Sequence, residues 1–493
     1  MLRTARARDQ GCVNGEWILS QSTARHGLLS LLLVSSALAL NGCTLLLDFD
    51  QCATDSDCSE GSQCVSNICE VAPGAERVHV NDVIATPTTW TADKVWILDD
   101  LIPVTASGTL TIEPGTTVLG NPGSALIVES GGKLIAEGTR EAPIVFSSSS
   151  PVGRRRAGDW GGVAMLGKAS VNRDNASLRI FPAVEGDPVS GENVNFGGSD
   201  DTWNCGSLKY VRIEFGGGRV RDEEALNGIT LAGCGSETQM SYVQVHLGAD
   251  DGVEIFGGTV NMDHILVTRA QDDGFDIDLG WRGRAQFVAI LQDAAGDNAV
   301  EIDNLGEDPT KLPLTDFDLY NFTLISDPEA ASRGITFKAG GIGTFSHGIV
   351  MGHGLEAIDV FGQESGALAN EGRALVERTL FYEIGDSESS GRYFPNNKED
   401  GEQDPNTEDP APSDDAGFEE DVFYVAAERN NVFGVDPGIP NVYDLFAPGW
   451  VPSAQEIQTI APPAPFDATA VYKGAFAPGQ ISWTDAWTAY PGN

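Results

Sequence analysis

Basic residues are scarce in this sequence. Its 493 residues include 30 Lys and Arg against 72 Asp and Glu, which gives a formal net charge of −42 at pH 7. A field of this sign repels nucleic acids and anionic membrane surfaces, so we expect no nucleic-acid partner for the folded body. Cations are the natural partners of such a chain, although a strongly hydrated surface would account for the same charge.

Signature motifs of common catalytic centres are also missing. The chain contains no G-x-S-x-G nucleophile elbow, no H-E-x-x-H zinc motif and no P-loop. His347 and His353 lie close together in sequence but lack a third ligand, so we interpret them as ordinary turn residues. The 58 glycines and 25 prolines favour turns over long helices, and therefore an all-β fold.

The N-terminal region has the pattern of an export signal. Several arginines precede an apolar run over 28–40, which has the length of a signal-peptide core and is short for a membrane span. The run leads into Leu-Asn-Gly-Cys, which resembles a bacterial lipobox ending at Cys43. We predict a signal peptide over 1–42, lipidation of Cys43, and a folded body at the outer membrane or cell surface. An uncleaved anchor over Leu28–Leu47 is the alternative, although it would bury Asn41 in lipid.

Cysteine usage agrees with export. Of eight cysteines, Cys12 lies in the leader and Cys43 is the lipidation candidate, which leaves six. Four of these lie in CATDSDCSEGSQCVSNIC, where little apolar content makes two disulfides the expected source of order. A zinc knuckle is the alternative for this Cys-rich segment over 43–75, but its spacing lacks a C-x-x-C pair. The other two are expected to pair, so the disulfide candidates are Cys52, Cys58, Cys64, Cys69, Cys205 and Cys234.

An internal repeat dominates the middle of the chain. Related triplets recur as NGITLAG, DGVEIFG, DGFDIDL, NAVEIDN, RGITFKA and EAIDVFG, at steps of 24, 22, 25, 35 and 23 residues. Short apolar stretches such as YVRIEF and YVQVHL lie between them. At least two short strands in each period are typical of a parallel β-solenoid, which we predict over 76–385.

The chain leaves the repeat near residue 385. Residues 386–420 are polar, acidic and punctuated by proline, so we predict a loop or linker there. The last segment, 421–493, contains Trp450, Trp483 and Trp487. Because a solenoid exposes an apolar end, we expect this segment to cap it, with a sugar-stacking platform as the alternative.

Several stretches together resemble a known family. GDWGGVAMLG, LKYVRIEFGGG, DDGVEIFGGTVN, QDDGFDIDLGWRG and the closing YKGAFAPG and WTDAWT are similar to exported right-handed β-helix repeat proteins of Gram-negative bacteria. The resemblance implies a right-handed parallel β-helix at the cell surface, here attached as a lipoprotein. It brings no established reaction, because members of this family are largely uncharacterised.

Acidic residues concentrate on three consecutive repeats. Period-2 alternation turns Val253 and Ile255 inward and Glu254 outward, and the next two repeats follow the same pattern. Equivalent carboxylates would stack about 4.8 Å apart and repel each other by about 3.5 kcal/mol at an effective dielectric near 20. Mobile counterions, bound calcium or raised pKa values would each relieve this repulsion. The candidate calcium ligands are Asp250, Asp251, Glu254, Asp272, Asp273, Asp276, Asp297 and Glu301.

An enzymatic function is the alternative, because right-handed β-helices also carry pectin-type hydrolases and lyases. QDDG, SHG and RGITFK resemble elements of polygalacturonase-like hydrolases, but RGITFK precedes SHG here, which reverses the family's order. An enzyme of this kind would use Asp273 and Asp276 as its carboxyl pair, or calcium with Arg333 or Lys338, on an acidic glycan. We expect instead a non-catalytic rod with a structural, adhesive or ligand-binding role toward glycans or surface proteins.

Overall fold

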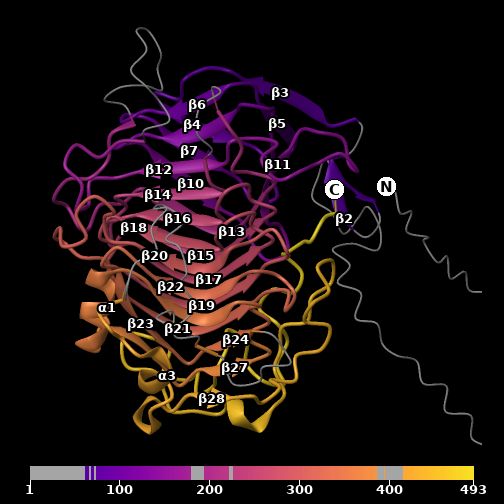
Figure 1. Ribbon diagram of the computed structural model, residues 1–493. Coiled ribbons are helices and arrows are strands. Elements are labelled where there is room, and N and C mark those ends of the chain that lie inside the picture. The colour runs from indigo at the N-terminus through magenta and orange to yellow at the C-terminus, as the bar shows by residue number, and fades with distance from the viewer. Residues whose placement is uncertain are drawn as a thin grey trace, which may run out of the picture. The chain divides into compact units, whose positions relative to one another are not determined.

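Short parallel strands follow one another through most of the chain and stack coil upon coil (Figure 1). The computed structural model describes residues 62–65, 68–71, 74–178, 194–220, 226–385, 393–394 and 415–492. All of these belong to one compact unit, Asp48–Asn493. Within these ranges, no helix has the length and apolar character needed to cross a membrane.

One wall of each coil belongs to a nine-stranded sheet, which we call the acidic sheet because it carries the acidic repeats. Every pairing in it is parallel. Its strands, in spatial order, are β6 (Leu101–Val104), β9 (Ala125–Val128), β12 (Val163–Leu166), β14 (Ile229–Ala232), β16 (Val253–Phe256), β18 (Phe275–Asp278), β20 (Asn298–Ile302), β22 (Arg333–Phe337) and β25 (Glu356–Val360).

The other walls belong to a 17-stranded parallel sheet, which we call the bent sheet. Its long central strands each turn a corner at one non-glycine residue of positive φ, for example Tyr242 at 54° and His264 at 54°. Its strands are β3 (Glu76–Val80), β4 (Pro87–Trp90), β5 (Lys94–Leu98), β7 (Thr109–Ile112), β8 (Thr117–Gly120), β10 (Lys133–Glu137), β11 (Ile144–Ser148), β13 (Gly206–Glu214), β15 (Gln239–His246), β17 (Asn261–Thr268), β19 (Arg284–Leu291), β21 (Asp316–Ile325), β23 (Ile342–Ser346), β24 (Ile349–Met351), β26 (Ala374–Glu377), β27 (Leu380–Tyr382) and β28 (Val432–Phe433).

This architecture is a right-handed parallel β-helix, which confirms the predicted fold class. The inward positions of the repeats fill its core, and Val253, Ile255, Phe275 and Ile277 are almost completely buried. The central coils each contain three straight segments, because the single bend residue divides a long strand into two walls. In the described part of the chain, the helices are α1 (Gln363–Asn370), α3 (Glu420–Phe423), and the 3-10 turns η4 (Ala427–Arg429) and η5 (Gln455–Ile457).

The bend residues of neighbouring coils stack on each other. The ring centroids of Tyr210 and Tyr242 are 4.5 Å apart, and those of Tyr242 and His264 are 4.2 Å apart. Left-handed backbone is costly for such side chains, and ring stacking along the column offsets part of that cost. The edges of this column meet Trp483 and Trp487 from the C-terminal segment.

The C-terminal segment divides into two parts. Its first part lies at the last coil, where β28 pairs with β27 and the Tyr424 hydroxyl donates to the carbonyl of Ala374. The second part runs back across earlier coils of the bent sheet, so Trp487 packs beside Tyr210. The outer side of these coils is apolar at positions such as Leu266, and this apolar surface needs the cover that the returning chain provides.

The predicted disulfide between Cys205 and Cys234 is present, with sulfur atoms 2.11 Å apart. In the Cys-rich segment, β1 (Ser62–Val65) and β2 (Ile68–Val71) form an antiparallel pair that places the backbone of Cys64 opposite that of Cys69. The predictions for the leader, Cys43, Cys52 and Cys58 fall outside the described residues, as does most of the predicted linker.

Candidate metal centre

The acidic repeats lie at the starts of β16, β18 and β20 in the acidic sheet. Parallel pairing places Glu254 beside Asp276, and Asp276 beside Glu301. Because side chains alternate along each strand, these three residues face away from the core in one row, as predicted. We call them the outer row.

A second row lies just before the strands and contains Asp251 and Asp273. The Oδ1 atom of Asp251 accepts the backbone N–H of Asp273 at 3.0 Å, and the Oδ1 atom of Asp273 accepts that of Asn298 at 2.7 Å. Asn227 begins this series by accepting the N–H of Asp251 at 3.1 Å. These side chains bind each coil to the next, and the two aspartates are only 7% and 4% exposed. Asp273 therefore holds the backbone in place, which conflicts with its use as a mobile catalytic acid.

The two rows bring carboxylates within the reach of one cation. Ligand atoms of Asp251, Glu254 and Asp276 lie within 4.8 Å of one another, and so do those of Asp273, Asp276 and Glu301. Asp276 belongs to both groups. One of its oxygens, Oδ1, is buried and has no hydrogen-bond partner in the described part of the chain.

Burial and mutual repulsion change the acidity of these groups. Burial raises the pKa of Asp251, Glu254, Asp273 and Asp276 well above the usual carboxyl range, and neighbouring carboxylates raise it further. Such a cluster is stable only with bound protons, a bound cation or both. Raised pKa values were one of the three remedies that the sequence suggested.

The two candidate bases lie at the C-terminal end of the cluster, and both are engaged in ion pairs. Lys338 Nζ lies 2.6 Å from Glu301 Oε2 and 3.7 Å from Asp303 Oδ2. These carboxylates raise the pKa of the Lys338 ammonium against the opposing effect of burial, so it remains protonated. Arg333 Nε lies 2.8 Å from Glu356 Oε1 and 3.3 Å from Asp359 Oδ2.

The remaining predicted ligands lie at the rim. Asp250, Asp272 and Asp297 are exposed in the turns that precede the strands. Ligand atoms of Asp272, Asp273 and Asp297 form a third group within 4.8 Å. Arg333 NH1 lies 3.8 Å from Asp297 Oδ1, so this rim group has a counter-charge nearby.

Sequence reasoning missed the asparagines that complete the rows. The Asn227 side chain donates to Glu254, and the Asn298 amide donates to Asp273 at 3.0 Å and to Glu301 at 3.3 Å. Both residues occupy the repeat position that aspartate occupies in the coils between them. That shared repeat position could have indicated their role, because the oxygen of an asparagine side chain can accept the same backbone hydrogen bond as aspartate.

The two histidines are buried, consistent with their interpretation as structural residues. Burial lowers the pKa of His353 to about 3 and also lowers that of His347, so both are neutral near pH 7. His347 Nε2 donates to the Ile460 carbonyl at 2.9 Å. Neither histidine belongs to a group of three metal-ligating side chains within the described ranges.

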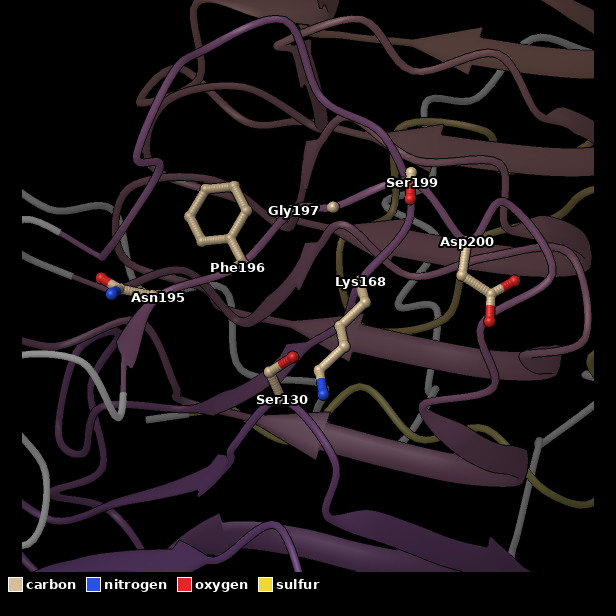
Figure 2. Close-up of a pocket in the computed structure, with 8 residues that line it drawn as sticks. Ser130, Lys168, Asn195, Phe196, Gly197, Ser199 and Asp200 are labelled. Atoms are coloured by element: carbon tan, nitrogen blue, oxygen red, sulfur yellow. The ribbon is translucent and has the colours of Figure 1, made fainter.

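A separate cavity of about 460 Å³ is lined by other residues. Figure 2 shows Lys168 extending toward Ser130, with Phe196 and Asp200 on either side of Lys168 in this view. The Lys168 ammonium also lies 4.7 Å from the centroid of the Trp203 ring. None of the predicted acidic ligands lines this cavity.

Comparison with known families agrees with the geometry. The model of a family described as a pectate-lyase-like β-helix domain matches residues 82–417. The chain belongs to this family. The match to the pectate-lyase-like β-helix family includes all of the acidic rows and ends before the returning C-terminal segment. No curated protein and no solved structure matches the chain.

Proposed function

We propose that this protein is a non-catalytic β-helix at the outer membrane or cell surface, whose acidic rows bind calcium. A lipid on Cys43 would attach it to the membrane, and its role would be structural, adhesive or ligand-binding toward glycans or surface proteins. The observation that carries the cation part of this proposal is the position of Asp276, which lies among four other carboxylates with one buried oxygen unpartnered.

The spacing of these oxygens suits calcium. Calcium takes six to eight oxygen ligands at about 2.3 to 2.6 Å, so two ligands on opposite sides of one ion lie about 5 Å apart. Carboxylate atoms within 4.8 Å of one another meet that limit. Magnesium requires shorter bonds and a stricter octahedron, which side chains fixed by the strand register fit less well.

The non-catalytic part rests on how the candidate catalytic groups are used. The backbone occupies one oxygen of Asp273, and ion pairs hold both Lys338 and Arg333. A lyase base must be able to accept a proton, whereas the carboxylates around Lys338 keep it charged. These groups act as a framework for the acidic rows.

A calcium-dependent polysaccharide lyase or hydrolase is the second candidate, and the pectate-lyase-like family match favours it. A screen of acidic glycans with calcium, read as unsaturated uronates and reducing ends, separates the two. Our proposal predicts no product from the full chain. Product formation that is lost in Arg333→Ala would establish the enzyme instead.

Cation binding and attachment have tests of their own. The melting temperature should rise with millimolar calcium and fall again with chelator, because a ligand that binds only the folded state stabilises it. An unchanged melting temperature would contradict the calcium site. Labelled fatty acid should enter the wild-type protein and not Cys43→Ser, and labelling of both would contradict the anchor.

A further inference from the structure

An arginine-rich turn stands out on this strongly acidic protein. Arg154, Arg155 and Arg156 follow one another between β11 and β12, and Arg219 lies in the matching loop of the next coil. Arg154, Arg156 and Arg219 are exposed, and Arg155 is partly buried. We call these four residues the arginine edge.

Backbone contacts hold the two loops together. The N–H of Gly158 donates to the carbonyl of Gly216 at 3.1 Å, and that of Gly218 donates to Trp160 at 2.8 Å. A Cβ atom on Gly218 would lie 2.0 Å from the carbonyl oxygen of Gly158. Only glycine fits this close contact, which brings the arginine turn beside the loop that carries Arg219.

The turn is also fixed internally. The carboxylate of Asp159 accepts the Ser148 hydroxyl at 2.5 Å and the backbone N–H of Arg156 at 3.1 Å. Arg155 Nε donates to the Ser150 carbonyl at 3.1 Å. A loop that is already ordered loses less conformational entropy when it binds a partner.

Within the described residues, the arginine edge lacks the ion pairs that several other arginines of this protein form. Arg212, Arg269 and Arg282 form ion pairs with Glu214, Asp293 and Asp201. No described carboxylate forms such a pair with the four guanidinium groups of the arginine edge.

We infer that the arginine edge is a docking surface for a linear glycan that carries carboxylate or sulfate groups. The planar guanidinium group binds such anions through two parallel hydrogen bonds. A broad anionic surface would meet the field of the whole body, with its net charge of −42, whereas one thin chain meets mainly the local charge.

The test is binding of dextran sulfate to the full chain at 50 mM salt with chelator, followed by light scattering and calorimetry. The triple variant Arg154→Gln, Arg155→Gln, Arg156→Gln should bind at least tenfold more weakly. A control with the same charge change, Arg77→Gln, Lys209→Gln, Arg284→Gln, removes exposed cations from the strands β3, β13 and β19 and should bind like the wild type.

Three results would overturn the inference: no binding of dextran sulfate, equal loss in both variants, or equal binding of uncharged dextran. Binding to phosphatidylglycerol vesicles but not to dextran sulfate would indicate that the arginine edge binds a membrane. That result would also reject the inference of a glycan ligand. The inference names a ligand for the binding role proposed above. Because the assay contains chelator, its failure leaves the calcium site standing, and loss of calcium binding leaves this result unchanged.

Discussion

Replacing Asp276 with asparagine is expected to stabilise the protein when no cation is present. The Asp276 carboxylate lies within 4.8 Å of ligand atoms from Asp251, Glu254, Asp273 and Glu301. Two full charges at that distance repel by about 3.5 kcal/mol at an effective dielectric near 20. Asparagine keeps the shape of the side chain and removes its charge.

The net gain is smaller than the sum of these repulsions, because raised pKa values leave part of the cluster protonated. We expect Asp276→Asn to raise the free energy of unfolding by about 1 to 3 kcal/mol at pH 8 in chelator. Urea unfolding followed by circular dichroism measures the difference. Asp82→Asn removes an exposed aspartate outside the acidic rows and serves as the matched control.

Calcium should reverse the order of stability of the wild type and Asp276→Asn. It is expected to stabilise the wild type and to have little effect on Asp276→Asn, because the variant lacks the ligand shared by both groups. An Asp276→Asn variant that is less stable than the wild type in chelator would refute this expectation. An equal gain in Asp82→Asn would refute it as well.

Three further predictions concern neighbouring features. Burial raises the pKa of Asp303 to about 8, so the folded state holds more protons than the unfolded chain between about pH 4 and pH 8. Between about pH 7 and pH 8, above the range in which the buried histidines titrate in the unfolded chain, stability in chelator should therefore fall as the pH rises, and a rise measured by urea titration would contradict this. Lys338→Met leaves Glu301 and Asp303 without their cation and should lower the free energy of unfolding by about 1 to 3 kcal/mol at pH 8. This loss should be smaller at pH 4, and a loss independent of pH would indicate an effect on packing instead. Removing the Cys205–Cys234 disulfide by Cys205→Ser should cost about 3 to 4 kcal/mol for a separation of 29 residues, and unchanged thermal stability would refute this.

The sequence predicted the coil and the direction of its side chains well. The alternation of Val253, Glu254 and Ile255 determines which of them face the core, because strand geometry has a period of two. The spacing of the repeats then aligns Glu254 with Asp276 and Glu301, as the observed register has them. These features follow from local geometry, which a sequence pattern records directly.

The different roles of the two acidic rows were harder to predict from the sequence. Asp273 and Asp276 look alike in sequence, yet only Asp273 accepts a backbone N–H from the next coil. That difference depends on where each side chain lies relative to the coil above it, which the register decides and the residue type does not.

The path of the C-terminal segment could not be predicted from a pattern of residues either. The sequence led us to expect Trp483 and Trp487 in a cap on the open end of the solenoid, but aromatic composition does not specify which surface such side chains cover. Their partners are the bend residues Tyr242 and His264, whose left-handed backbone leaves no mark in the alternation of the strands.

Calorimetric titration of calcium into the chelator-treated full chain at pH 7.5 is the decisive test of the cation site. We expect saturable binding in the wild type and in Asp82→Asn, with at least tenfold weaker binding in Asp276→Asn. Absence of a calcium-dependent heat and of any calcium-dependent rise in melting temperature would contradict it. Equal affinity in Asp276→Asn would contradict it too, because the ion would then lie outside the two groups that Asp276 joins.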